Sequence, residues 1–118
     1  MKKAKDIARL RALSEMVLDA RLANLRAKAE ARQSTMDKLN GLCAPTPTLD
    51  DKAGVADAVA ALNFQIWAEA RRADLSQNLA RQTAEWMDSR DQARLAFGQA
   101  RGFEKLTDQL RAAKRPLP

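Results

Sequence analysis

Acidic side chains and a single cysteine are the groups in this sequence that could take part in chemistry. Asp50 and Asp51 are adjacent, and Asp88 and Asp91 stand three residues apart, so each pair could hold a general acid beside a general base. The chain has no histidine and one cysteine, Cys43. This excludes a Ser-His-Asp triad and nearly every zinc site.

The structural explanation of the acid pairs is a cap or an ion-pair partner on a helix surface, which is the commoner use of such residues. The sequence also has no glycine-rich phosphate loop and no nucleophile motif. We therefore expect a non-enzymatic protein with no catalytic residues, no metal and no cofactor.

The basic residues are concentrated at the two ends of the chain. Residues 1–11 and 101–118 hold ten basic and three acidic residues, in a chain whose formal net charge is +6. Charge at helix ends often only complements the helix dipole. The alternative is a binding surface for an acidic protein cavity, nucleic acid or an anionic membrane. The candidate partner-binding residues are Lys2, Lys3, Lys5, Arg9, Arg11, Arg101, Lys105, Arg111, Lys114 and Arg115.

The elements that must position these residues are expected to be helices. With 31% charged and 4% aromatic residues, the composition is typical of long helices or coiled coils, and the length fits one domain. Residues 3–39 contain no proline or glycine, and Asn40-Gly41 is a helix stop. Residues 40–48 form the turn, and a second helix follows over about 49–114. A bend is expected near 98–102, where Gly98 and Gly102 weaken the helix.

Apolar residues follow heptad steps in both segments and predict the helix contact. The fold class is therefore all-α, a long antiparallel α-helical hairpin of coiled-coil type with an extended or bent C-terminal helix. The first stripe includes an eleven-residue stutter from Leu10 through Ser14 and Leu18 to Leu22. On the second helix the stripe consists of Val55, Val59, Leu62, Ile66, Ala70, Ala73, Gln77, Ala80, Ala84 and Met87. The residues predicted to be buried are Leu18, Leu22, Leu25, Met36, Leu39, Leu62 and Ile66.

The two helices differ in length, so a register must be assumed. Pairing outward from a turn at 40–48 sets Lys3 opposite Glu85, which leaves the chain from Trp86 onward without an intramolecular partner. This overhang should fold back, dimerise or meet a partner, because it is too apolar for a solvated lone helix. Phe64 and Trp67 either flank the core or belong to a partner patch. The apolar partner patch is predicted to comprise Phe64, Trp67, Trp86, Phe97, Phe103, Leu106 and Leu110.

Targeting signals are not evident. No apolar run reaches the length of about 20 residues that a bilayer requires, and charged residues interrupt the basic N-terminus where a signal peptide would be apolar. A cytoplasmic protein is expected. A mitochondrial presequence remains the alternative, because residues 1–13 are basic and amphipathic.

The C-terminal residues 101–115, RGFEKLTDQLRAAKR, resemble the ending of the flagellar export protein FliJ and its type III secretion stalk relatives. The resemblance rests on Glu104-Lys105-Leu106 followed by Arg111, within a two-helix chain that is basic at both ends. It implies a central stalk whose terminal end enters a hexameric export ATPase ring, while other surfaces engage the export gate or chaperones. No catalytic residue carries over. The alternatives are a basic nucleic-acid-associated helical protein and a self-associating structural adaptor. The basic residues are not interleaved with aromatics along one face, which disfavours nucleic acid.

Overall fold

The computed structural model describes residues 2–42 and 54–114. It contains helix α1, Lys2–Leu42, and helix α2, Val55–Lys114. No strand occurs in these two ranges, so the prediction of an all-α helical hairpin is confirmed. Cys43, the pair Asp50-Asp51 and Arg115 lie outside the described residues, as does most of the predicted turn.

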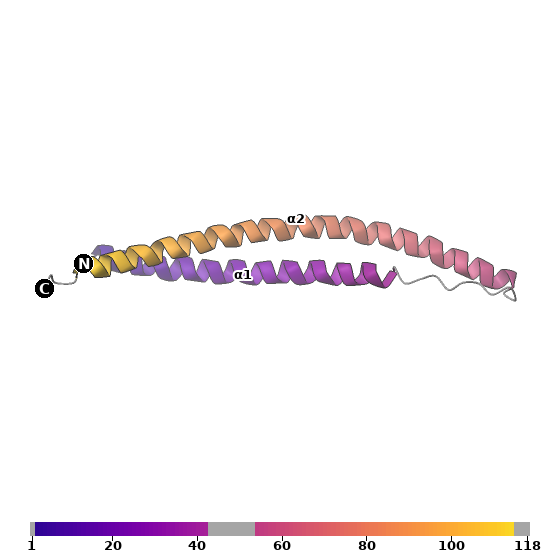
Figure 1. Cartoon of the computed structure of the whole chain (residues 1–118), viewed down its shortest axis with the longest axis horizontal. Helices are drawn as coiled ribbons and strands as arrows, with labels where there is room; N and C mark the ends of the chain where they lie inside the picture. Colours follow the sequence, from indigo (N-terminus) through magenta and orange to yellow (C-terminus); the bar gives the residue numbers. More distant parts are fainter. Residues whose placement is uncertain (1, 43–53, 115–118) are drawn as a thin grey trace. The chain divides into compact units, whose positions relative to one another are not determined.

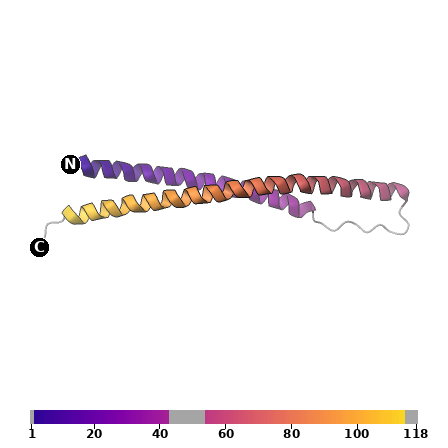
Figure 2. The same ribbon diagram turned by 90° about the horizontal axis from the view of Figure 1, so that it is seen from above.

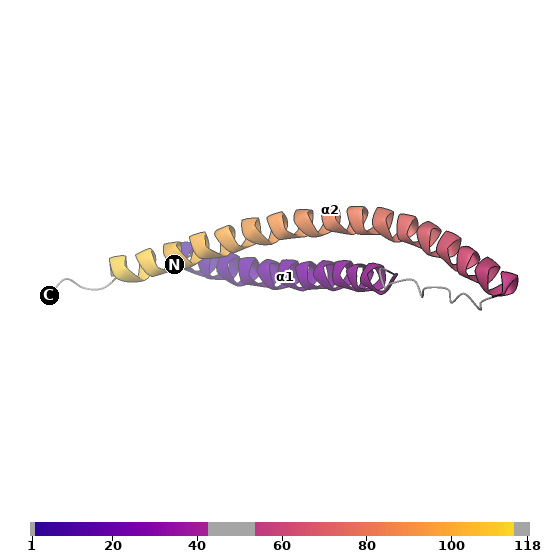
Figure 3. The same ribbon diagram turned by 45° about the vertical axis from the view of Figure 1, so that its right-hand side comes forward.

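The chain packs as two units, each containing part of both helices. Unit 1 is Met1–Ala29 with Glu85–Pro118, and unit 2 is Glu30–Ala84. Within each unit the α1 and α2 segments run in opposite directions (Figures 1 and 2). Figure 3 shows the N-terminal turns of α1 beside the C-terminal turns of α2, which both belong to unit 1.

Hydrogen bonds between the helices define the register in each unit. In unit 1 a guanidinium nitrogen of Arg21 donates to Gln92 Oε1 at 2.8 Å, and Lys28 Nζ donates to Glu85 Oε2 at 3.2 Å. In unit 2, Arg72 donates to the carbonyl oxygen of Leu42 at 3.1 Å. The two residue numbers of each pair add up to 113 or 114.

This register corrects the predicted one. Lys28, not Lys3, is the residue that meets Glu85, so α2 from Trp86 onward packs against the first half of α1 within unit 1. The predicted unpaired overhang is therefore wrong. Pairing outward from a short turn failed because Leu42, the last residue of α1, contacts Arg72, so the first turns of α2 lie beyond the end of α1.

The helix contact is a heptad seam that contains the predicted Leu18, Leu25 and Leu39 on α1 but none of the stripe predicted on α2. Its residues follow steps of three and four, and nearly all of them are buried or half-buried. On α1 the seam residues are Ala4, Ile7, Arg11, Ser14, Leu18, Arg21, Leu25, Lys28, Arg32, Thr35, Leu39 and Leu42. On α2 they are Leu75, Leu79, Gln82, Trp86, Ser89, Ala93, Ala96, Ala100, Phe103, Thr107 and Leu110. Arg21 is exposed and joins the seam through its bond to Gln92.

Alanine and hydroxyl residues form the most buried part of this seam. Ala93, Ala96, Ser14, Thr35 and Ser89 are all buried. Each hydroxyl donates to a carbonyl of its own helix: Ser14 Oγ to Arg11 at 2.7 Å, Thr35 Oγ1 to Ala31 at 3.2 Å and Ser89 Oγ to Glu85 at 2.9 Å. A buried hydroxyl without a partner would cost about 1–3 kcal/mol. Bonding within the helix avoids this cost, and Ser89 Oγ also accepts a hydrogen bond from Asn24 Nδ2 of α1 at 3.3 Å.

Several large apolar residues lie outside the seam as a result. The predicted stripe on the second helix is wrong, because Leu62 is 56% and Ile66 58% exposed. The predicted stutter is wrong too, since Leu10 and Leu22 are exposed while the regular seam passes through Ser14 and Leu18. Of the α1 residues predicted to be buried, Leu18, Leu25, Met36 and Leu39 are half-buried. A shift of one residue turns a helix by about 100°, so a wrong choice of stripe exposes a different face.

The glycines do not have the predicted structural effects. α1 continues through Asn40-Gly41 to Leu42, and no described glycine has a positive φ, so the predicted helix stop is wrong. α2 is helical throughout Gly98 and Gly102, and a Cβ added at either would meet no atom within 4 Å. These two glycines therefore neither interrupt the helix nor permit a close helix contact.

Candidate partner-binding surfaces

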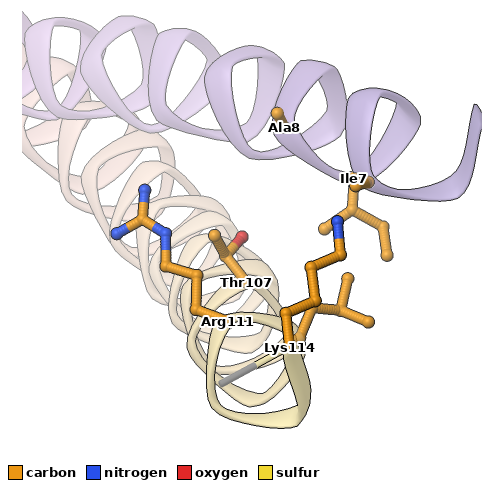
Figure 4. A pocket seen from close by; sticks show the side chains of 7 residues that line it. Ile7, Ala8, Thr107, Arg111 and Lys114 are labelled. Carbon is orange, nitrogen blue, oxygen red and sulfur yellow. The ribbon is translucent and has the colours of Figure 1, made fainter. Parts of the chain in front are cut away.

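A small cavity lies between the two helix ends of unit 1. It measures about 240 Å³ and is lined by three α1 residues and four α2 residues. Figure 4 shows the side chain of Lys114 reaching from α2 toward Ile7 on α1, while the side chain of Arg111 points to the other side of the cavity. The lining residues are Ala4, Ile7, Ala8, Thr107, Leu110, Arg111 and Lys114. The cavity thus has apolar walls and two cations at its edge.

Further basic side chains lie on the same segments of α1 and α2 but do not line this cavity. Lys3, Lys5 and Arg9 on α1 and Lys105 on α2 are exposed, and no described ion pair involves them. Together with Arg111 and Lys114 they form the basic end of unit 1. The side chain of Lys2 lies outside the described residues.

Two other predicted basic residues are engaged within their own helices. Arg11 Nε forms an ion pair with Glu15 at 3.4 Å. Arg101 contacts Glu104 at 3.5 Å, and its guanidinium lies 5.5 Å from the centre of the Phe97 ring. Ion pairs at exposed positions contribute about 0–1 kcal/mol, so these contacts orient the side chains more than they stabilise the fold.

The predicted apolar patch divides into seam residues and exposed residues. Trp86, Phe103 and Leu110 are half-buried in the seam of unit 1, and Leu110 also lines the cavity at the basic end. Phe97 and Leu106 are exposed on α2.

Phe64 and Trp67 contact each other on unit 2. Their ring centroids lie 5.8 Å apart at an interplanar angle of 38°, and both side chains are exposed. Leu62 and Ile66 are exposed as well, so they do not form a core that the two rings could flank. The partner-patch interpretation therefore fits the exposure of this aromatic pair.

Two further apolar surfaces were not predicted as binding candidates. On α1 of unit 1, Leu10, Leu13, Met16 and Val17 are exposed. On α2 of unit 2, the exposed residues include Val55, Val59, Leu62 and Ile66. Of these residues, Leu10 and the four on α2 were predicted to lie in the contact between the two helices. The small residues Ser89, Ala93, Ala96 and Ala100, at heptad spacing, are the sequence signal for the true seam.

The acid pair on α2 has a structural explanation. Asp88 Oδ2 accepts a hydrogen bond from Gln92 Nε2 at 3.0 Å, and Asp91 lies 3.6 Å from the guanidinium of Arg90. Within residues 2–42 and 54–114 no group of three or more potential metal ligands is found. In these ranges no helix is both long and apolar enough to cross a membrane.

Comparison with protein-family models, with curated proteins and with solved structures finds no match for this chain.

Proposed function

We propose that this chain is a non-enzymatic helical-hairpin adaptor that binds an acidic protein partner through the basic end of unit 1. The resemblance of residues 101–115 to FliJ and its stalk relatives suggests the partner, which is a hexameric export ATPase ring. In this proposal the cytoplasmic ring wall supplies the acidic groups, and this chain supplies the central stalk.

The gathering of basic residues from both ends of the sequence is the observation that carries the proposal. Arg111 and Lys114 border the cavity of unit 1, and Ile7 and Leu110 line its walls. A partner with an acidic rim and an apolar anchor complements this arrangement, because the anchor is desolvated while the charges set orientation and approach. The acidic residues of the two terminal segments, Asp6, Glu104 and Asp108, are fewer than the basic residues.

Charge reversal at the basic end tests the proposal. The substitutions Lys3→Glu, Lys5→Glu, Arg111→Glu and Lys114→Glu should abolish stimulation of the ATPase by this chain. All four side chains are exposed, so helicity measured by circular dichroism should not change. Binding by the native chain should weaken with salt, because exposed charges are screened over about 10 Å at 0.1 M ionic strength.

A control variant with the same net charge distinguishes the effect of charge at the basic end from the effect of the net charge of the whole chain. Arg26→Glu, Lys38→Glu, Arg71→Glu and Arg94→Glu reverse four exposed charges away from the basic end, and this variant should keep most of the stimulation. Equal loss in both variants would contradict a specific basic end. Binding of nucleic acid with a steep salt dependence, with no effect on the ATPase, would replace the proposal with the nucleic-acid alternative.

A further inference from the structure

Four exposed apolar residues on unit 2 form a stripe along α2. Val55, Val59, Leu62 and Ile66 are all at least half exposed and follow steps of four, three and four. At 100° per residue their directions fall within about 60° of one another. Ala61, which is half-buried, and Ala68, which is buried, lie on another side of the helix. Leu42, where α1 ends, contacts Arg72, so the stripe is a helix-packing surface that α1 does not reach.

The steps of four, three and four residues are the same in either chain direction. In an antiparallel pairing with an identical helix, Val55 faces the partner's Ile66, and Val59 faces the partner's Leu62. The two-fold axis generates each of these two pairs a second time, so all four residues of each copy contact an apolar residue of the other. An isologous contact of this kind requires only the stripe itself.

The charge pattern also favours a second copy of this chain. Residues 58–68, AVAALNFQIWA, contain no charged side chain, although 31% of the chain is charged. The positions that would flank the stripe in this pairing are Ala56, Ala58, Asn63 and Gln65. Two copies of a protein with a net charge of +6 repel each other at most other surfaces. Here they bring together no like charges.

We propose that the chain forms an antiparallel homodimer through the stripe of Val55, Val59, Leu62 and Ile66. This contact is separate from the basic end, and neither proposal depends on the other. Four apolar layers with small flanking residues give a short two-stranded coiled coil. The dimer should dissociate on dilution, because one such contact per chain buries a limited apolar area.

Sedimentation analysis over a concentration series tests the dimer with a matched pair of variants. Leu62→Glu lies in the stripe and Leu13→Glu lies on α1, and both leucines are 56% exposed. The native chain and Leu13→Glu should dimerise, while Leu62→Glu should stay monomeric with unchanged helicity. A monomeric native chain at every concentration would show that a different molecule covers the stripe and overturn the proposal. A Leu62→Glu variant that dimerises like the native chain would overturn it equally.

Cysteine cross-linking tests the antiparallel arrangement. With Cys43→Ser as background, a mixture of Val59→Cys and Leu62→Cys chains should form a mixed disulfide on mild oxidation, because facing seam positions come within disulfide reach. Val59→Cys chains alone should cross-link poorly. The opposite result, efficient cross-linking of Val59→Cys alone and not of the mixture, would indicate a parallel contact and refute the proposed one.

Discussion

Small side chains at the seam determine which residues this protein exposes. Ala93, Ala96 and Ser89 are 3–5% exposed, whereas Leu95 and Phe97 on the same turns of α2 are more than half exposed. Alanine buries little area, so its contribution to hydrophobic stability at about 25 cal/mol per Å² is small. In this part of α2 the helix pair is held by close contact of small residues, and Leu95 and Phe97 remain exposed.

Overpacking the seam tests this assignment at a single residue. Ala96→Leu should lower the free energy of unfolding by about 1–3 kcal/mol, because a larger side chain at a buried alanine forces the helices apart. Ala20→Leu on the exposed side of α1 should have little effect. Urea unfolding followed by circular dichroism measures both. Equal stability of the two variants would mean that Ala96 does not lie between the helices.

Two helices were the part of the fold that could be predicted, because residues 3–39 lack helix breakers and residues 55–114 contain no proline. The seam on α2 could not be predicted, because the most apolar heptad stripe, Val55, Val59, Leu62 and Ile66, lies beyond the end of α1. The part of α2 that contacts α1 begins near Leu75 and uses smaller residues on a different face.

The unknown register and seam also limited the prediction of the candidate site. The basic residues could be identified from their positions at the chain ends, since antiparallel helices bring both ends together. The burial of Trp86 and Phe103 could not be predicted, because it depends on the register of the two helices, which the length of the turn alone does not determine. The heptad spacing places Phe64 and Trp67 on a different face of the helix from Leu62 and Ile66. The stripe of Leu62 and Ile66, however, is not a core.

Gly98 offers a test at the level of the helix. Its substitution by alanine should raise the free energy of unfolding by about 1 kcal/mol, because glycine is that much worse than alanine in a helix interior and the added Cβ meets no neighbour within 4 Å. Thermal unfolding measures the change. Gly54→Ala, at a position just before α2, serves as the control and should change stability less. A destabilised Gly98→Ala variant would indicate a bend or close contact at this position.

At the scale of the whole molecule, the register links the separate surfaces. It brings residues near Lys3 together with residues near Lys114 in unit 1, and it leaves the Val55–Ile66 stripe of unit 2 outside the helix contact. A partner at the basic end and a second copy at the stripe would therefore occupy different units. Such an arrangement suits an adaptor, because one contact need not displace the other.

The register itself can be measured directly with one pair of double-cysteine variants in a Cys43→Ser background. Ser14 and Ala100 are buried seam residues whose numbers fit the observed register, so Ser14→Cys with Ala100→Cys should oxidise to an intramolecular disulfide in high yield. Ser14→Cys with Asp74→Cys matches the register that places Lys3 opposite Glu85, and it should remain reduced under the same conditions. A disulfide in the second variant and not in the first would contradict the seam, the composition of the basic end and the exposure of the stripe together.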